Sequence, residues 1–232
     1  MKALILAAGM GTRLLENTKE IPKCLVRVNG KPILEYQLEA LMANDIKDIV
    51  IVVGYKAEKI REFIDSNEKF RDLNIQFVEN KEYAESNSSY SFWLAKDKIK
   101  DESYLHFNCD IIFFADLLKE VIESKYDNVI VIDTKIDLDE SMEQVLMEGD
   151  QIKIMEKENL KNAHGKAVGI AKFSPENINW IINRLNDYIS KGDKNQNFYG
   201  MIRQAVHHRK FYGIKTRDHK VVEINNIADL KK

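Results

Sequence analysis

The chain has 232 residues, 44% of them hydrophobic, and its 35 basic and 37 acidic side chains give a formal net charge of −2. This near-neutral charge argues against a nucleic-acid-binding protein, which would carry a basic stripe. At roughly 150 residues per domain the length allows one or two domains, and because no Pro/Gly/Ser-rich linker divides the chain, we expect one. The apolar run after Met1 and Lys2 is too short for a signal peptide or a membrane span. We therefore expect a cytoplasmic protein with no membrane partner.

The first 110 residues alternate between predicted strands and predicted helices. Continuous apolar runs predict strands that are buried on both faces, and apolar residues at helical spacing predict helices. This alternation predicts a parallel sheet with helices on both of its faces. The predicted strands are 2–7, 48–53, 73–78 and 103–107, and the predicted helices begin at Pro32, Glu58 and Tyr90.

Ligands of open parallel sheets bind outside the carboxyl ends of the strands. Four segments of the first half follow predicted strands, and we expect them to lie along one rim of the sheet. They are 8–13, 54–55, 80–89 and 108–110.

The second half is less regular. A hairpin is predicted to turn at Gly149-Asp150, and a last helix is predicted over 226–231. Between them we expect strands over 166–173, 210–216 and 220–224 and helices over 175–191 and 197–208. The whole pattern predicts a single α/β domain over 1–232, with a mostly parallel, mixed central sheet flanked by helices.

The first loop, in "LILAAGMGTRL", is neither of the two common phosphate-binding motifs. It lacks the GxxxxGK[ST] string of a P-loop, and Leu14 stands where a GxGxxG fingerprint needs its third glycine. The glycines allow backbone N–H groups to form an anion-binding nest. Arg13 adds a guanidinium suited to phosphate oxygens. Taken alone, the loop is equally compatible with a glycine-rich turn that carries a surface arginine.

The longer string "LAAGMGTRL…PKCLVRVNGKPILEYQLEAL" resembles the nucleotidyltransferases that activate phosphorylated small molecules, namely the sugar-1-phosphate nucleotidylyltransferases and their short cytidylyltransferase relatives. The resemblance implies a nucleotide-binding half over 1–110 and an acceptor-binding half over 111–232. It implies that Arg13 and Lys23 are catalytic cations, with Lys23 between the α-phosphate and the acceptor phosphate. It also implies a Mg²⁺ cofactor on Asp110. The further residues that it places at the nucleotide are Leu6, Ala7, Ala8, Gly9, Gly11 and Thr12.

The stretch "EYAESNSSYSFWLAKDKI" is similar to the phosphocholine cytidylyltransferases of bacterial surface decoration, whose relatives act on aminoethylphosphonate and on phosphorylated amino-acid amides. This likeness implies CTP as the nucleotide. It places the cytosine near Tyr55, Asn87 and Ser88. Asn and Ser are also favoured helix N-caps, so both roles stay open for Asn87 and Ser88.

Three further positions follow from the resemblance. "KIMEKENL" resembles a Glu-Lys segment that implies Lys157 as a cation for the acceptor phosphate and Glu156 beside the acceptor's organic part. The family's C-terminal Glu-Ile-Asp is here Glu223-Ile224-Asn225, so the second metal ligand would be an uncharged Asn225. Either the metal site is weaker, or Glu223 takes over that role, or the alignment slips by one residue. Glu223 is otherwise expected at the acceptor.

The reaction implied is attack by a phosphate or phosphonate oxygen of a small metabolite on the α-phosphorus of CTP, which gives a CDP-linked product and pyrophosphate. Such products would serve the decoration of cell-surface polysaccharide or lipid. Two alternatives stay open: a hexose-1-phosphate nucleotidylyltransferase that uses UTP or dTTP, and a non-catalytic nucleotide-sensing homologue. The sequence does not predict an oligomeric state.

Overall fold

The centre of the molecule is a nine-stranded mixed sheet in the order β5-β4-β1-β6-β11-β8-β12-β10-β9. The structure, a computed structural model, describes residues 1–231. The strands of this sheet are β1 (Lys2–Ala7), β4 (Asp48–Val53), β5 (Asn74–Glu79), β6 (Tyr104–Asn108), β8 (Val129–Asp133), β9 (Gln144–Glu148), β10 (Gln151–Glu156), β11 (Gly165–Phe173) and β12 (Phe211–Lys215).

The parallel part of the sheet lies mainly in the N-terminal half. Strands β5, β4, β1 and β6 run parallel, and β12 runs parallel to β8. Strand β11 is antiparallel to both of its neighbours in the order, β6 and β8. The predicted mixed sheet is therefore confirmed, with its second half largely antiparallel. Gly169 allows β11 to pass β6 closely, because a Cβ there would lie 2.6 Å from the Cβ of Asn108.

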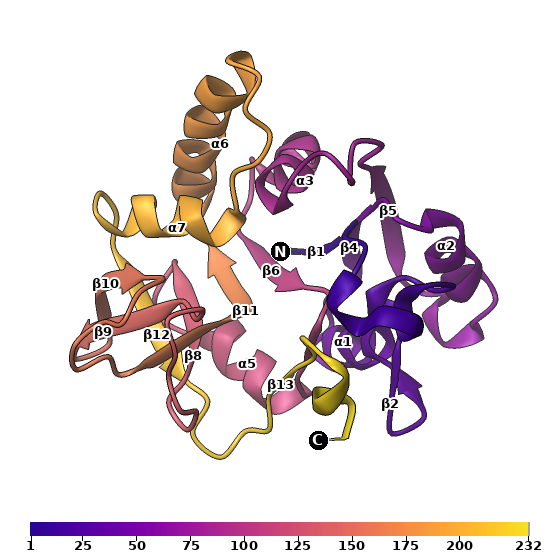
Figure 1. The fold of residues 1–232 in the computed structure, drawn as a ribbon, viewed down its shortest axis with the longest axis horizontal. Coiled ribbons are helices and arrows are strands. Elements are labelled where there is room, and N and C mark those ends of the chain that lie inside the picture. Colours follow the sequence, from indigo (N-terminus) through magenta and orange to yellow (C-terminus); the bar gives the residue numbers. More distant parts are fainter. Residues whose placement is uncertain (232) are drawn as a thin grey trace.

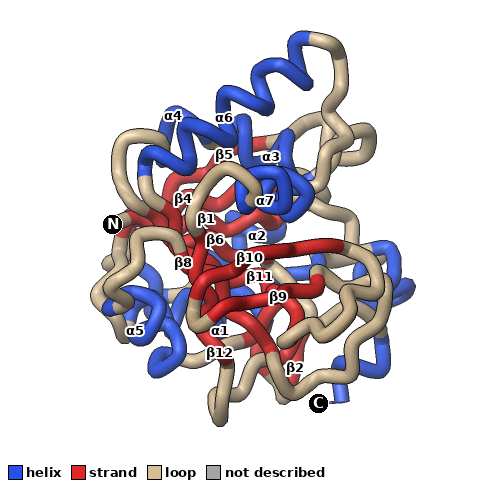
Figure 2. Tube along the Cα trace, turned by 90° about the vertical axis from the view of Figure 1, so that its left-hand side faces the viewer, coloured by secondary structure: helices blue, strands red, loops and turns tan. Residues whose placement is uncertain are grey.

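Helices cover both faces of the sheet, as predicted (Figure 2). Side chains alternate along β1, so that Ala3 and Ile5 pack under α1, α2 and α5 while Leu4 and Leu6 pack under α3, α6 and α7. The helices are α1 (Ile33–Met42), α2 (Ala57–Asp65), α3 (Ser88–Leu94), α4 (Lys96–Ile99), α5 (Ala115–Glu123), α6 (Pro175–Ser190) and α7 (Phe198–Val206).

Short elements complete the fold. Asn29 and Gly30, with φ of 50° and 81°, form the predicted tight turn between β2 (Arg27–Val28) and β3 (Lys31–Pro32). The last predicted helix is the 3₁₀ helix η4 (Ile227–Lys231). The remaining short elements are the 3₁₀ helices η1 (Thr12–Thr18), η2 (Lys23–Leu25) and η3 (Glu68–Phe70) and the paired strands β7 (Ile111–Ile112) and β13 (Val222–Glu223).

The two halves face one another across the carboxyl ends of β1 and β6 (Figure 1). The C-terminal segment, yellow in Figure 1, returns to the N-terminal half, where β13 pairs with β7. Residues that are far apart in the sequence therefore meet at the rim of the sheet. Among the described residues, no helix has the length and hydropathy needed to cross a bilayer.

Candidate active site

A cleft of about 950 Å³ lies at this rim and is lined by both halves of the chain. Three of the four predicted rim segments, 8–13, 80–89 and 108–110, contribute to its lining, whereas 54–55 lies behind the first loop. Predicted site residues that line it are Leu6, Ala8, Gly9, Gly11, Thr12, Arg13, Lys23, Asn87, Ser88, Asp110, Lys157, Glu223 and Asn225.

The first loop is supported from behind and open in front. Tyr55 donates its backbone N–H to the Ala8 carbonyl at 3.0 Å, and a Cβ on Gly54 would lie 2.8 Å from that same oxygen. Gly11 has a φ of +63°, in the left-handed region that favours glycine. A Cβ on Gly9 would meet no atom within 4 Å. The loop therefore presents bare backbone to the cleft, with room in front of Gly9.

Lys23 and Asp110 form an ion pair inside the cleft. Lys23 Nζ lies 2.6 Å from Asp110 Oδ2, and the two side chains are only 10% and 18% exposed. Asp110 follows β6 in a turn held by the buried Gln37, whose Nε2 donates to the carbonyls of Asn108 and Ile111 at 2.8 Å each. Such burial strengthens the charge of Lys23 toward an incoming anion, because little water screens it.

Asp110 also has a free oxygen. Its Oδ1 is buried and accepts no hydrogen bond from any residue that the structure describes. A carboxylate oxygen of this kind is a preferred ligand of Mg²⁺. Among the side chains that the structure describes, however, no group of three or more from His, Cys, Asp or Glu is arranged to hold a metal. The chain thus fits Mg²⁺ through one carboxylate, with the remaining ligands left to the phosphates of a nucleotide and to water.

Arg13 and Asn225 meet across the mouth of the cleft. Arg13 Nη2 donates to Asn225 Oδ1 at 3.0 Å, and the Asn225 backbone N–H donates to Asp229 Oδ2 at 2.9 Å. The predicted metal ligand Asn225 therefore reaches the cleft and gives its carbonyl oxygen to Arg13. Because an amide carries no charge, the guanidinium keeps its full charge for an anionic ligand.

A second ion pair lines the cleft and was not predicted. Lys166, at the start of β11, pairs with Glu223 of β13, and their side chains are 11% and 22% exposed. Glu223 is thus already engaged by a cation. One signal for Lys166 was available in the sequence, namely a lysine inside the apolar run "KAVGIAKF", which was predicted to be a strand.

The loop over 80–87 and the start of α3 form one side of the cleft and are held by side-chain hydrogen bonds. Asn80 is 1% exposed, and its Nδ2 donates to Ser86 Oγ and Ser91 Oγ at 3.0 Å. Asn87 caps α3 through Oδ1, which confirms its predicted capping role. Ser88 Oγ accepts from the Phe198 N–H at 2.9 Å, which ties this loop to α7. Contact of Asn87 and Ser88 with a base stays a prediction.

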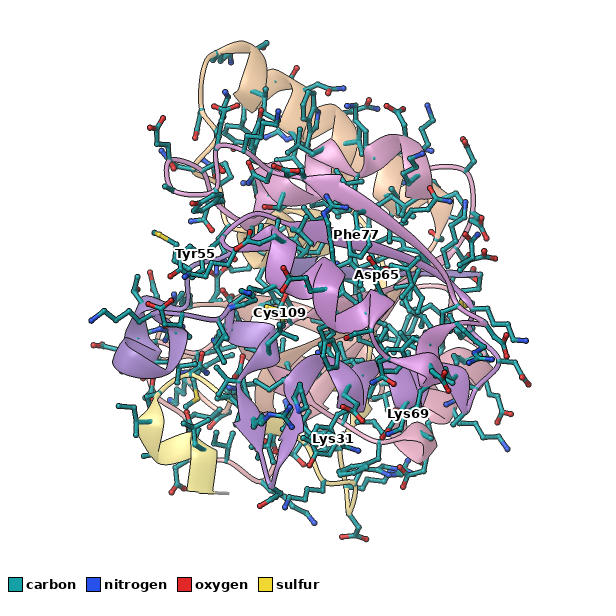
Figure 3. The ribbon with its side chains drawn as sticks, turned by 90° about the vertical axis from the view of Figure 1, so that its right-hand side faces the viewer. Lys31, Tyr55, Asp65, Lys69, Phe77 and Cys109 are labelled. Atoms are coloured by element: carbon teal, nitrogen blue, oxygen red, sulfur yellow. The ribbon has the colours of Figure 1, made fainter. Side chains whose placement is uncertain are left out.

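Three predicted residues lie outside the lining. Ala7 is 1% exposed and packs on the opposite face of β1. The Tyr55 hydroxyl donates to the carbonyls of Thr18 and Lys19 at 3.0 Å, which braces the first loop (Tyr55 is labelled in Figure 3). Glu156 lies 3.9 Å from His207 Nε2. Alternation along β10 explains the last case, because Glu156 and Lys157 cannot both face the cleft from an extended strand end.

The C-terminal half contributes carboxylates that the sequence did not single out. Asp133, Asp139 and Glu143 line the cleft, and Arg203 Nη1 donates to both oxygens of Glu143 at 2.7 and 2.6 Å. The Tyr199 hydroxyl donates to the Val168 carbonyl at 2.5 Å. Burial raises the pKa of Tyr199 well above its usual value, and the negative charges of Glu223, Glu143 and Asp110 raise it further. Tyr199 therefore stays neutral.

A match to a family model identifies the class of protein to which the chain belongs. Residues 2–142 match the family model described as "Nucleotidyl transferase". That match covers more than half of the chain, and the protein belongs to the nucleotidyl transferase family.

Two relatives with similar sequences are cytidylyltransferases. The chain is 30% identical over 234 residues to choline-phosphate cytidylyltransferase of Streptococcus pneumoniae, covering 100% of this chain and 96% of that protein. It is 33% identical over 138 residues to the CTP:phosphoglutamine cytidylyltransferase of Campylobacter jejuni, covering 57% of this chain and 53% of that protein.

Solved structures agree on the fold. The structure of CTP:phosphocholine cytidylyltransferase from Streptococcus pneumoniae aligns with a TM-score of 0.79 at 23% identity over 98% of this chain and 95% of that one. The inositol-1-phosphate CTP transferase from T. maritima aligns with a TM-score of 0.81 at 22% identity over 98% and 90%.

Proposed function

We propose that the protein is a CTP-dependent cytidylyltransferase. In this reaction a phosphate or phosphonate oxygen of a small metabolite attacks the α-phosphorus of CTP, a P–O bond forms to the metabolite, and the P–O bond to pyrophosphate breaks. The observation that carries the proposal is the nearly buried Lys23–Asp110 pair, which lies beside a glycine loop open to the cleft. The full-length likeness to a cytidylyltransferase supports the choice of CTP.

The nucleotide binds to the 1–110 half. The backbone from Leu6 to Thr12 contacts the triphosphate through the N–H groups that Gly9 and Gly11 leave accessible. Arg13 neutralises the outer phosphates, and Lys23 neutralises the α-phosphate. The loop with Asn87 and Ser88 binds the cytosine, supported by the buried Asn80.

Mg²⁺ is the proposed cofactor. Asp110 holds it through the free Oδ1, and the carbonyl oxygen of Asn225 is the second candidate ligand from the chain. When bound, the ion neutralises phosphate charge and aligns the triphosphate. Arg13 engages Asn225 Oδ1 and Lys166 engages Glu223, so either residue would have to exchange its present partner for the ion.

The 111–232 half binds the acceptor. Glu143 is already paired with Arg203, so Asp133 and Asp139 are the carboxylates of this half that would favour an acceptor whose organic part carries a positive charge. Tyr83 and Tyr199 are the only aromatic residues in the described lining, and Tyr83 belongs to the nucleotide side. A quaternary ammonium is best held by several aromatic faces, whereas a primary ammonium is held by hydrogen bonds to carboxylates. This lining favours aminoethylphosphonate or a phosphorylated amino-acid amide over phosphocholine.

Catalysis rests on position and charge. A phosphate ester is already an adequate nucleophile at pH 7, so the chain supplies no nucleophile of its own. Arg13, Lys23 and Lys157 lower the repulsion between two anions and hold them in line. The amide at position 225 is the one feature that favours a non-catalytic nucleotide-sensing homologue.

Pyrophosphate release from CTP with Mg²⁺ tests the proposal. The acceptors are phosphocholine, phosphoethanolamine, aminoethylphosphonate, phosphorylated amino-acid amides, inositol phosphate and glucose-1-phosphate. We expect release with CTP and one of the amine-bearing acceptors. Release with glucose-1-phosphate and UTP or dTTP would establish the hexose alternative. CTP binding without release for any of these acceptors would favour the nucleotide-sensing alternative.

A further inference from the structure

The burial of Lys166 needs a reason. A lysine is almost never buried without a partner, because the loss of hydration of its ammonium is costly. Lys166 is 8% exposed and lies in the wall of the cleft, where its partner is Glu223. An apolar pair of the same size would cost less desolvation at this position. Stability alone is therefore a weak reason for an ion pair at this position.

The Lys166–Glu223 pair lies next to the Lys23–Asp110 pair. The Ile224 N–H donates to the Asp110 carbonyl at 2.8 Å, and Glu223 is in register with Ile111 where β13 pairs with β7. The two carboxylates are thus anchored on neighbouring backbone. Each holds one ammonium of the cleft wall.

We infer that Lys166 binds the phosphate of the acceptor, which displaces Glu223 from the lysine. This inference rests on the proposed function and deepens it. A phosphate dianion carries more charge than a carboxylate and offers three acceptor oxygens, so it competes effectively for the ammonium. The acceptor phosphate then lies between Lys166 and Lys23, beside the α-phosphorus that it attacks.

Lys157, which the sequence predicted for this role, is less suited to it. Its side chain is exposed on the wall of the cleft and forms no ion pair with any side chain that the structure describes. An exposed ammonium on a flexible stem is screened by water and pays entropy to hold one position. Lys166 is held in place by Glu223 and is largely shielded from water, so its ammonium is already positioned to bind an anion.

Matched variants separate these roles. Lys166→Met removes the charge and keeps most of the volume. Lys157→Met removes the cation that the family resemblance assigns to the acceptor phosphate. Lys172→Met is the control, because Lys172 is a second buried lysine of β11, 5% exposed, that donates to the carbonyls of Ile122 and Ser124 and does not line the cleft. The double variant Lys166→Met with Glu223→Gln removes both charges, so that no carboxylate is left buried and unpaired.

The first readout is calorimetry with inorganic phosphate, which stands for the acceptor's phosphate and needs no turnover. We expect Lys166→Met and the double variant to weaken phosphate binding about 10- to 100-fold. We expect CTP affinity to change less than about threefold, and Lys172→Met to leave phosphate binding near the wild-type value. Lys157→Met should weaken phosphate binding less than Lys166→Met does, because the Lys157 ammonium is exposed and screened by water. In turnover, the KM of the acceptor should rise by a similar factor while the KM of CTP stays the same.

Unchanged phosphate binding in both Lys166 variants would overturn the inference. An equal loss of CTP and phosphate affinity would also overturn it, because Lys166 would then serve the triphosphate. Failure of the proposed function is a separate result: the wild-type chain would bind phosphate through Lys166 and release no pyrophosphate with any acceptor.

Discussion

Lys23 and Asp110 lie 87 positions apart in the sequence, yet their charged atoms are 2.6 Å apart in the cleft. Lys23 begins η2, shortly after the first loop and η1. Asp110 lies just beyond the carboxyl end of β6. Their contact therefore joins the segment after the first loop to the carboxyl end of β6 inside the cleft. Four expectations about the site and the core can be tested by substitution.

Replacing Lys23 with alanine should impair catalysis and leave the fold intact. Loss of one preorganised charge at a transition state costs roughly 3–4 kcal/mol in comparable sites, so kcat/KM should fall by about two orders of magnitude or more. Steady-state kinetics at saturating Mg²⁺ measure the effect. Lys31→Ala is the control, since Lys31 pairs with Glu39 and does not line the cleft. Wild-type kcat/KM in Lys23→Ala would remove Lys23 from the mechanism.

A methyl group at Gly9 should block the nucleotide without harming the fold. Nothing lies within 4 Å of a Cβ built at Gly9, so Gly9→Ala should keep the wild-type Tm. The methyl would occupy the space in front of the loop, and calorimetry should show CTP affinity lowered by about tenfold or more. Gly54→Ala is the contrasting variant: its Cβ would lie 2.8 Å from the Ala8 carbonyl oxygen, so its Tm should fall. Undiminished CTP affinity in Gly9→Ala would place the triphosphate elsewhere.

Restoring a carboxylate at position 225 should strengthen metal-dependent nucleotide binding. Asn225→Asp adds a charged oxygen, which Mg²⁺ prefers to an amide carbonyl. The Mg²⁺ concentration that supports half-maximal CTP binding should fall several-fold. Asn226→Asp is the matched control, because it adds the same charge to the same wall of the cleft. If both variants shift the Mg²⁺ dependence equally, or neither does, residue 225 is no metal ligand.

His106 should make the protein less stable as the pH falls. The ring is fully buried against Phe198, with centroids 4.3 Å apart, and burial lowers its pKa to about 3. Between pH 6.5 and 3 the unfolded chain protonates this ring and the folded chain does not. The contribution of His106 is therefore complete above about pH 6.5 and falls by up to about 1.4 kcal/mol per pH unit below it.

Urea unfolding at pH 7, 6 and 5 measures this slope. His106→Phe keeps a ring of similar shape and should show a shallower loss of stability over this range. His207→Phe, on an exposed position, is the control. Equal slopes for the wild type and His106→Phe would contradict the assignment of this pH dependence to His106.

Much of the fold was predictable because local sequence patterns, namely apolar runs and turn residues, specify its strands and turns. The apolar runs of β1, β4 and β6 predict strands buried on both faces, and the hairpin at Gly149-Asp150 lies where the turn residues predict it. The direction of β11 was not predictable, because the same apolar run fits a parallel or an antiparallel neighbour. The segment over 111–133 was not assigned, although it contains α5 and β8.

The lining of the cleft was predictable where backbone and charge follow a strand end, as in the first loop and at Asp110. Lys166 and Asn80 were missed because their roles depend on partners distant in the sequence or on burial that one sequence position does not reveal. Tyr55 was predicted at the base, yet its hydroxyl braces the carbonyls of Thr18 and Lys19. A side chain at the carboxyl-end rim of the sheet can therefore support the first loop without lining the cleft itself.

We propose that the rim of the N-terminal sheet holds the triphosphate of CTP. A crystal structure of the chain with CTP and Mg²⁺ is the decisive experiment. We expect a triphosphate against the backbone of Gly9 and Gly11, with Lys23 at the α-phosphate and a metal ion on Asp110. A complex in which CTP binds away from this rim, or in which the rim stays empty at saturating CTP and Mg²⁺, would contradict it.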